Sequence, residues 1–140
     1  MKNKYFIATD ILIDYIIYDK FTKENTNDSC EYIKNILEGN KNICVVNSSS
    51  LIEILYYSKN KSFINKIASL LICFYSDTDK WQVLEENENI IEDTLEYCKT
   101  TNMKYKNALQ YFCALKSECK AIVSNDIDFL NLDFPVIGIK

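Results

Sequence analysis

The sequence contains no histidine among its 140 residues. This absence excludes Ser-His and Cys-His nucleophilic catalysis, imidazole general bases and zinc sites built from cysteine and histidine. The only glycines are Gly39 and Gly138, whereas a P-loop or a dinucleotide-binding loop needs several glycines in one short segment. Carboxylates, lysines, tyrosines, serines and thiols are the groups that remain for chemistry.

The sequence also lacks a long apolar run. Its longest, residues 67–75, is interrupted by Ser69 and is far shorter than the roughly 20 residues that span a bilayer. The N-terminal apolar segment turns polar at Thr9, unlike a signal peptide. We therefore expect a cytoplasmic protein without a membrane segment. With 48% apolar residues, residues 1–140 are expected to form one globular domain.

The six cysteines form no Cys-x-x-Cys pair and lie mostly in apolar stretches. They are Cys30, Cys44, Cys73, Cys98, Cys113 and Cys119. This pattern favours buried free thiols in a reducing compartment over a disulfide framework or a structural metal site.

The formal net charge is −4, which is not typical of a nucleic-acid-binding protein. Binding to nucleic acid would therefore need a local basic patch or a bridging metal. The lysines gather in two groups, Lys59, Lys61 and Lys66, and Lys99, Lys104 and Lys106. Solvated helix faces are the favoured interpretation of both groups, and a basic patch is the alternative.

Short apolar runs alternate with segments of helical periodicity. Strands are predicted at residues 5–8, 43–46, 121–123 and 136–139, with one more at either 73–75 or 82–84. Helices are predicted at residues 11–16, 30–38, 48–56, 63–71, 90–98 and 105–115. This alternation predicts an α/β fold with three layers, α/β/α, around a mostly parallel sheet of four or five strands.

Polar side chains follow the predicted strands. In parallel sheets functional groups gather beyond the carboxyl ends of the strands, where this sequence places Asp10, Glu53, Asp126 and Asp128. Carboxylates from separate strand ends can hold Mg²⁺ or Mn²⁺, which lowers the pKa of an attacking water and offsets charge on a phosphate. Because this design needs no histidine, it is one of the few hydrolytic mechanisms that the composition permits.

Each of these carboxylates also has a structural interpretation. Ser50 and Glu53 have the spacing of a capping box, in which the glutamate binds the backbone of the cap residue. Asp126 is typical of a turn or a helix cap, and Asp10 could cap the helix that follows the first strand. The residues alone do not decide between these roles and metal binding.

The segment from residue 105 to 139 resembles the closing half of a PIN domain, the fold of the VapC-type toxin ribonucleases. Ser124, Asp126, Asp128 and Phe129 are similar to the family's Thr-x-Asp-x-Asp-Phe signature. The resemblance implies that Asp126 is the fourth acid of the site, supported or replaced by Asp128. It also implies that Glu53 is an acid of the site, because the family carries one in this Ser/Thr-x-x-Glu context.

The chain departs from the family at two positions. Ala8 stands where the first acid is expected, in an Ala-Thr-Asp frame that resembles the family's Asp-Thr-Asn. If extended geometry continued to Asp10, its carboxylate would point to the same side as residue 8, about 6–7 Å further along. Asn107 stands where the family's helix begins with aspartate, and it offers a metal only one neutral oxygen. Losing two charges is expected to weaken metal binding severely.

The resemblance thus implies a relative of the Mg²⁺- or Mn²⁺-dependent ribonuclease toxins of toxin–antitoxin systems, with RNA cleavage weak or lost. The catalytic candidates are Glu53, Asp126, Asp10 and Asp128. The metal-binding candidates are Glu53, Asp126, Asp10 and Asn107. RNA, an antitoxin-like protein and a second copy of the chain are the partners that the family implies.

Two alternatives remain open. In the first, Asp10 and Asp128 restore the metal site and the protein is an active metal-dependent endoribonuclease. In the second, the protein is a non-catalytic module that binds RNA or protein, and a large exposed apolar patch on the early helices would favour it. The candidates for such a surface are Tyr15, Tyr18, Tyr56 and Tyr57.

Overall fold

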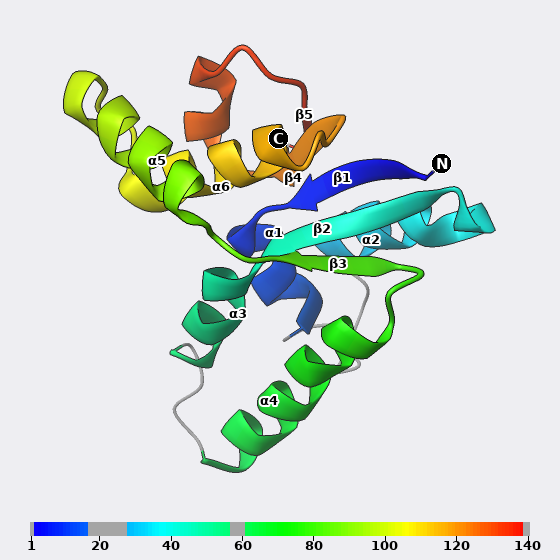
Figure 1. Ribbon diagram of the computed structural model, residues 1–140. Coiled ribbons are helices and arrows are strands. Elements are labelled where there is room, and N and C mark those ends of the chain that lie inside the picture. Colours follow the sequence, from blue (N-terminus) through cyan, green and yellow to red (C-terminus); the bar gives the residue numbers. More distant parts are fainter. Residues whose placement is uncertain (1, 17–27, 57–60, 139–140) are drawn as a thin grey trace.

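The computed structural model describes residues 2–16, 28–56 and 61–138, without the side chains at positions 28, 61–63 and 66. Its strands are β1 (Asn3–Ile7), β2 (Asn42–Asn47), β3 (Trp81–Leu84), β4 (Ala121–Ser124) and β5 (Val136–Gly138). They form one sheet in the order β3-β2-β1-β4-β5, and every neighbouring pair is parallel (Figure 1). This sheet confirms the predicted fold class.

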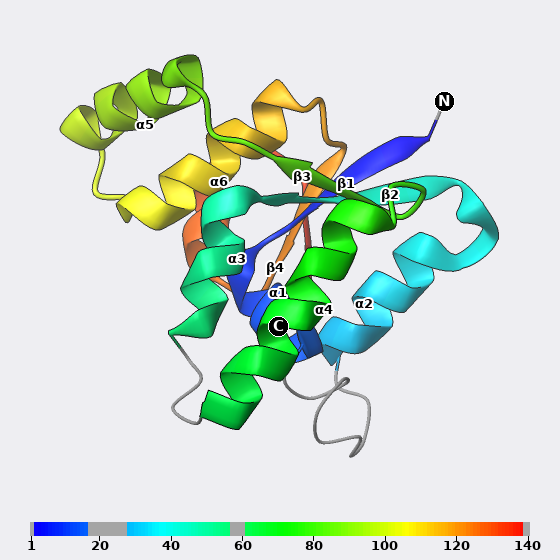
Figure 2. The same ribbon diagram turned by 60° about the horizontal axis from the view of Figure 1, so that its bottom comes forward.

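Helices cover both faces of the sheet. They are α1 (Thr9–Asp14), α2 (Asp28–Leu37), α3 (Ser48–Leu55), α4 (Lys61–Ser76), α5 (Glu88–Thr100) and α6 (Tyr105–Lys116), with 3₁₀ turns η2 (Glu38–Asn40) and η3 (Ile127–Asn131). The pair α5 and α6 lies on one face, and α1 to α4 lie on the other (Figures 1 and 2). No helix among the described residues is long and apolar enough to cross a membrane.

Two apolar cores fill the space between the sheet and its helices. Because side chains alternate along a strand, neighbouring residues of one strand enter different cores. Ile7, Val46 and Val123 belong to the core under α1 to α4. Phe6, Val45 and Ile122 belong to the core under α5 and α6. The continuous apolar runs of the sequence are thus explained by a sheet that is buried on both faces.

The strand that was predicted at either residues 73–75 or residues 82–84 is β3. Residues 73–75 lie inside α4, and Trp81 begins the strand. The ring of Trp81 packs against Phe74, with centroids 4.4 Å apart, and against Tyr15 at 6.0 Å. Ile139, predicted in the last strand, lies outside the described residues, as do Tyr18 and Tyr57.

The six cysteines, all within the described residues, form no disulfide, and Cys30, Cys44, Cys113 and Cys119 are buried, as expected. Burial raises the pKa of Cys113 to about 12 and that of Cys119 to about 11. Since the thiolate is the reactive form, these side chains serve as small apolar groups of the core. Cys73, by contrast, is exposed.

Candidate functional site

The carboxyl ends of β1 and β4 mark the place where a ligand site is expected in this topology. β1 has β2 on one side and β4 on the other, so the order of the chain reverses between β1 and β4. The backbone N–H of Ala8 donates to the carbonyl oxygen of Val123 at 3.0 Å, which holds the two strand ends together. The residues that follow these strands include Asp10, Asp126 and Asp128.

Asp10 lies in the first turn of α1, whose N-cap is Ala8. Both sequence-based ideas about its geometry are therefore wrong, because residue 10 is neither extended nor a cap. Its carboxylate instead reaches the end of β4 and accepts hydrogen bonds from the Ser124 hydroxyl at 3.0 Å and the Asn125 N–H at 2.9 Å. The side chain thus joins the start of α1 to the turn after β4.

Burial raises the pKa of the Asp10 carboxyl above its ordinary value. The hydrogen bonds from Asn125 and Ser124 oppose this shift, and the negative charge of Asp126 adds to it. Burial is thus the main cause of the raised pKa of Asp10, and the charge of Asp126 is the smallest contribution to it.

Asp126 shapes the turn into η3. Its Oδ1 accepts a hydrogen bond from the Asp128 N–H at 2.9 Å, so Asp126 caps this 3₁₀ turn, in agreement with the structural interpretation of its sequence context. Its own N–H donates to the Ser124 hydroxyl oxygen at 3.0 Å. These bonds direct the other carboxylate oxygen, Oδ2, toward α6.

Asn107 lies in the first turn of α6 and is 8% exposed. Its Nδ2 donates to Asp126 Oδ2 at 3.1 Å and to Asp128 Oδ2 at 3.0 Å. Ionised carboxylates only accept hydrogen bonds, so the amide nitrogen and not the amide oxygen must face them. Asn107 is therefore oriented as a donor between two acids, and not as the neutral oxygen ligand that we expected.

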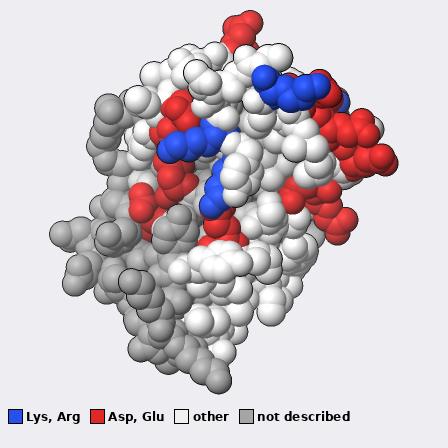
Figure 3. Space-filling view, turned by 90° about the vertical axis from the view of Figure 1, so that its left-hand side faces the viewer, with Lys and Arg blue, Asp and Glu red and all other residues white. Residues whose placement is uncertain are grey.

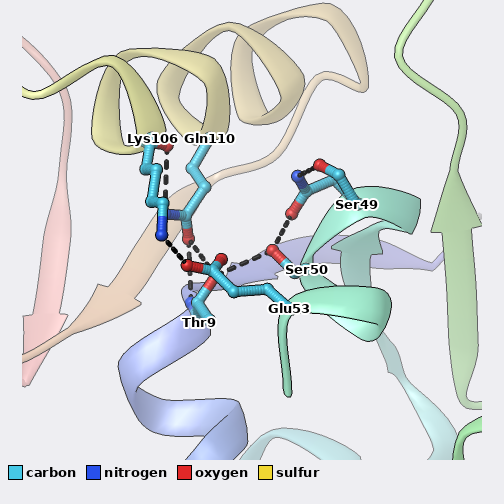
Figure 4. Close-up of polar contacts among 7 residues, drawn as sticks. Thr9, Ser49, Ser50, Glu53, Lys106 and Gln110 are labelled. Carbon is cyan, nitrogen blue, oxygen red and sulfur yellow. Dashed lines mark hydrogen bonds and ion pairs between the residues drawn. The ribbon is translucent and has the colours of Figure 1, made fainter. Parts of the chain in front are cut away.

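Glu53 forms an ion pair with Lys106, the residue before Asn107 (Figure 4). The Glu53 side chain, on α3, is 19% exposed, and the Lys106 side chain is 54% exposed. Both residues line a groove of about 470 Å³ between α3 and α6, together with Tyr56 and Tyr105. The acid that follows β2 is thus neutralised by a full positive charge from α6.

The predicted capping box is wrong. The N-cap of α3 is Asn47, three residues before Ser50. Glu86, which follows β3, accepts hydrogen bonds from the Ser49 N–H and the Ser48 hydroxyl, both at 3.0 Å. An acid from a neighbouring strand end therefore caps α3, and Glu53 has no part in the cap.

Buried polar side chains connect the ends of β1 and β2 to α6 (Figure 4). Gln110 Oε1 accepts from the Thr9 N–H at 2.8 Å, and Ser50 Oγ donates to Asn47 Oδ1 at 2.6 Å. Because Ser50 uses its proton on Asn47, the 2.7 Å contact between the two hydroxyls has Thr9 as donor. Sequence reasoning missed this network and the pairing of Lys106 with Glu53, although Lys106 and Gln110 are spaced to share one face of the predicted helix.

The acidic side chains do not assemble into a metal site as they are arranged. Among the described residues, no three histidine, cysteine, aspartate or glutamate side chains form a group that could hold a metal ion. Glu53 is paired with Lys106, Asp126 and Asp128 share the amide of Asn107, and Ala8 supplies no ligand. This donor set therefore does not fit a divalent cation.

Positive and negative side chains are intermixed at the surface. On the face in Figure 3, the described lysines lie beside acidic side chains. Lys99 pairs with Glu96 at 3.4 Å and Lys116 with Asp93 at 3.1 Å. The predicted group Lys99, Lys104 and Lys106 is thus partly neutralised, whereas the side chains of Lys59, Lys61 and Lys66 lie outside the described structure.

The chain has the fold of solved toxin–antitoxin structures. A chain of a toxin–antitoxin complex from Klebsiella pneumoniae superposes with a TM-score of 0.69 at 12% identity, covering 96% of each chain. A chain of VapBC2 from Rickettsia felis, bound to a DNA fragment from its promoter, gives 0.68 at 14% identity and covers 97% of this chain and 98% of its own. VapC20 from Mycobacterium tuberculosis, a toxin that cleaves the sarcin-ricin loop, gives 0.69 at 12% identity, with 93% and 95% covered.

This likeness confirms the expected PIN fold over nearly the whole chain. No protein-family model and no curated protein sequence matches the chain. At this level of identity the fold is shown, and the activity has to be argued from the site.

Proposed function

We propose that this chain is a PIN-domain protein of the VapC type in which metal-dependent RNA cleavage is weak or lost. The observation that carries the proposal is the Asn107 amide, which donates to both Asp126 and Asp128. Metal-assisted hydrolysis needs a cation that binds the phosphate and lowers the pKa of a water. Here the ligand positions at 8 and 107 have lost their charge, and the remaining acids have partners within the protein.

We further propose that the protein acts by binding an antitoxin-like protein. Support comes from a groove of about 360 Å³ between α3 and α4. Ile52, Ile72 and Tyr75 line it and are 62%, 65% and 55% exposed. Large apolar side chains that are exposed together are typical of protein–protein contacts. The toxin–antitoxin complexes with this fold make a small protein partner the first to test. RNA and a second copy of the chain are further candidate partners.

The test is cleavage of a structured RNA mixture with excess Mn²⁺. We expect the natural sequence to cleave at a rate that Glu53→Ala and Asp126→Ala leave unchanged. We expect the double variant Ala8→Asp/Asn107→Asp to cleave RNA with Mn²⁺ at least about a hundredfold faster than the natural sequence, because it restores two charged ligands on the same fold.

One outcome would overturn the proposal. If the natural sequence cleaves RNA with Mn²⁺ and both alanine variants abolish that activity, the reduced set of acids is sufficient. Asp10 and Asp128 would then be the acids that compensate, and the protein would be an active endoribonuclease.

A further inference from the structure

Two consecutive residues at the start of α6 contact most of the acids at this end of the sheet. The Lys106 ammonium pairs with Glu53, and the Asn107 amide donates to Asp126 and Asp128. The Lys106 carbonyl oxygen also accepts from Gln110 Nε2 at 3.2 Å, and Gln110 Oε1 accepts from the Thr9 N–H. The backbone that carries both donors is therefore tied, through Gln110, to the end of β1.

We propose that the Lys106 ammonium and the Asn107 amide take the place of the divalent cation, so that this acidic site is complete without a metal. The inference rests on the proposed function and deepens it, because it names the groups that bind the acids in place of a cation. Family resemblance alone predicts only that two ligands are missing. The contacts show in addition that Lys106 and Asn107 bind the remaining acids Glu53, Asp126 and Asp128.

The chemistry of the two donors supports this role. A divalent cation binds oxygen, and the N–H groups of an amide cannot be its ligands. To bind between Asp126 and Asp128, a cation would have to displace Asn107 Nδ2 from both carboxylates, which lie 3.1 and 3.0 Å from it. It would also have to compete with the charge of Lys106 for Glu53. Because Asn107 is buried, displacing its amide would also leave buried polar atoms without partners.

The experiment measures thermal unfolding and direct Mn²⁺ binding by titration calorimetry, for the natural sequence and for Asn107→Asp. We expect the unfolding midpoint of the natural protein to be the same in EDTA and in Mn²⁺. In EDTA, Asn107→Asp is expected to unfold about 3–6 °C lower, because three carboxylates then converge without the amide donor between them. Mn²⁺ is expected to reverse this loss and to bind at least about tenfold more tightly than to the natural protein.

Three further variants make the test specific. Asn131→Asp adds the same carboxylate at an exposed position of η3, and its midpoint is expected not to respond to Mn²⁺. Lys106→Met in the Asn107→Asp background is expected to tighten Mn²⁺ binding again, because Glu53 becomes available. If Asn107→Asp does not fold, Asn107→Ala removes the donor without adding charge, and its midpoint should rise in Mn²⁺ where that of the natural protein does not.

The proposal is overturned if Mn²⁺ binds to the natural protein as tightly as to Asn107→Asp, or if neither Asn107→Asp nor Asn107→Ala gains a response to Mn²⁺. These results are distinct from failure of the proposed function, which is read from RNA cleavage. A natural protein that binds Mn²⁺ and does not cleave RNA would sink this inference and leave the proposed function standing.

Discussion

The acids at the β1 and β4 ends and the acid at the β2 end have different kinds of partner. Asp10, Asp126 and Asp128 accept hydrogen bonds from uncharged groups, namely a hydroxyl, backbone N–H groups and the Asn107 amide. Glu53 is paired with the full charge of Lys106 at a partly exposed position. Uncharged donors that are shielded from water act over short distances, whereas an exposed ion pair is weakened by salt. The two strand ends, contacted by the consecutive residues Lys106 and Asn107, should therefore respond differently to mutation and to ionic strength.

The largest expected effect comes from replacing Gly138, which should disturb the β4 end more than the β2 end. Gly138 of β5 has φ of +118°, and a Cβ at this position would lie 2.4 Å from the carbonyl oxygen of Ser124. Gly138→Ala is expected to lower the free energy of unfolding by about 2–4 kcal/mol, from backbone strain and from the steric overlap. Urea unfolding gives this number, and the environments of Asp126 and Asp128 should change more than that of Glu53 in NMR spectra.

Gly39 provides the matched control for this substitution. Its φ is +81°, but a Cβ there would have no neighbour within 4 Å. Gly39→Ala should therefore cost only the backbone strain, about 1 kcal/mol. Equal losses for the two alanine variants would mean that the turn after β4 moves to admit a Cβ. The close packing of this turn against β5 would then not be what holds the carboxylates in place.

The strands and helices that carry both groups of acids could be predicted from the sequence. Buried apolar runs and helical periodicity placed the strands, and the rule that polar residues gather at the carboxyl ends of parallel strands brought Asp10, Asp126 and Asp128 to one edge. The two positions without the expected carboxylate, Ala8 and Asn107, were also visible. These features depend on local pattern and on chain order, which a single sequence records.

The partners of the acids could not be predicted, because they depend on tertiary contacts. Glu53 and Lys106 are 53 residues apart, and the acid that caps α3, Glu86, is 37 residues from Ser49. The capping box was a reasonable local prediction for Glu53. In the structure, however, Glu86 from another strand end accepts the hydrogen bonds at the start of α3. The orientation of Asp10 was missed because α1 begins at Thr9, two residues earlier than extended geometry through Asp10 would allow.

A smaller effect compares the charged donor, Lys106, with the uncharged donor, Asn107. Lys106→Met is expected to lower the free energy of unfolding by about 0.2–1 kcal/mol, because Lys106 is largely exposed, and about 1 M salt should remove most of that loss. Asn107→Ala should cost more, about 1–3 kcal/mol, and change less with salt, because its amide is buried. Urea unfolding of both variants at low and high salt measures the contrast.

Lys116→Met is the matched control for the ion pair. Lys116 and Asp93 form a pair at 3.1 Å with side chains 46% and 44% exposed. Its loss should be no larger than that of Lys106→Met, whose partner Glu53 is better shielded. If Asn107→Ala proves as sensitive to salt as Lys106→Met, the two regions do not differ in the way that their contacts suggest.

The smallest effect concerns the pH dependence at the β1 and β4 ends. Burial raises the pKa of Asp10 in the folded protein, so the native state holds this proton more tightly than the unfolded chain does. The contribution of Asp10 to stability should therefore fall as the pH rises from the ordinary carboxyl pKa of about 3.9 through the raised value, and then stay constant. Asp10→Asn has no such proton, so the free energy of unfolding of the natural protein minus that of Asp10→Asn should decrease with pH in this window.

Urea unfolding between about pH 3.5 and 6.5 measures this difference, and the sign of its change with pH is the decisive result. An increase with pH would show that the hydrogen bonds from Ser124 and Asn125 outweigh burial, and that uncharged donors suffice to keep this buried acid ionised.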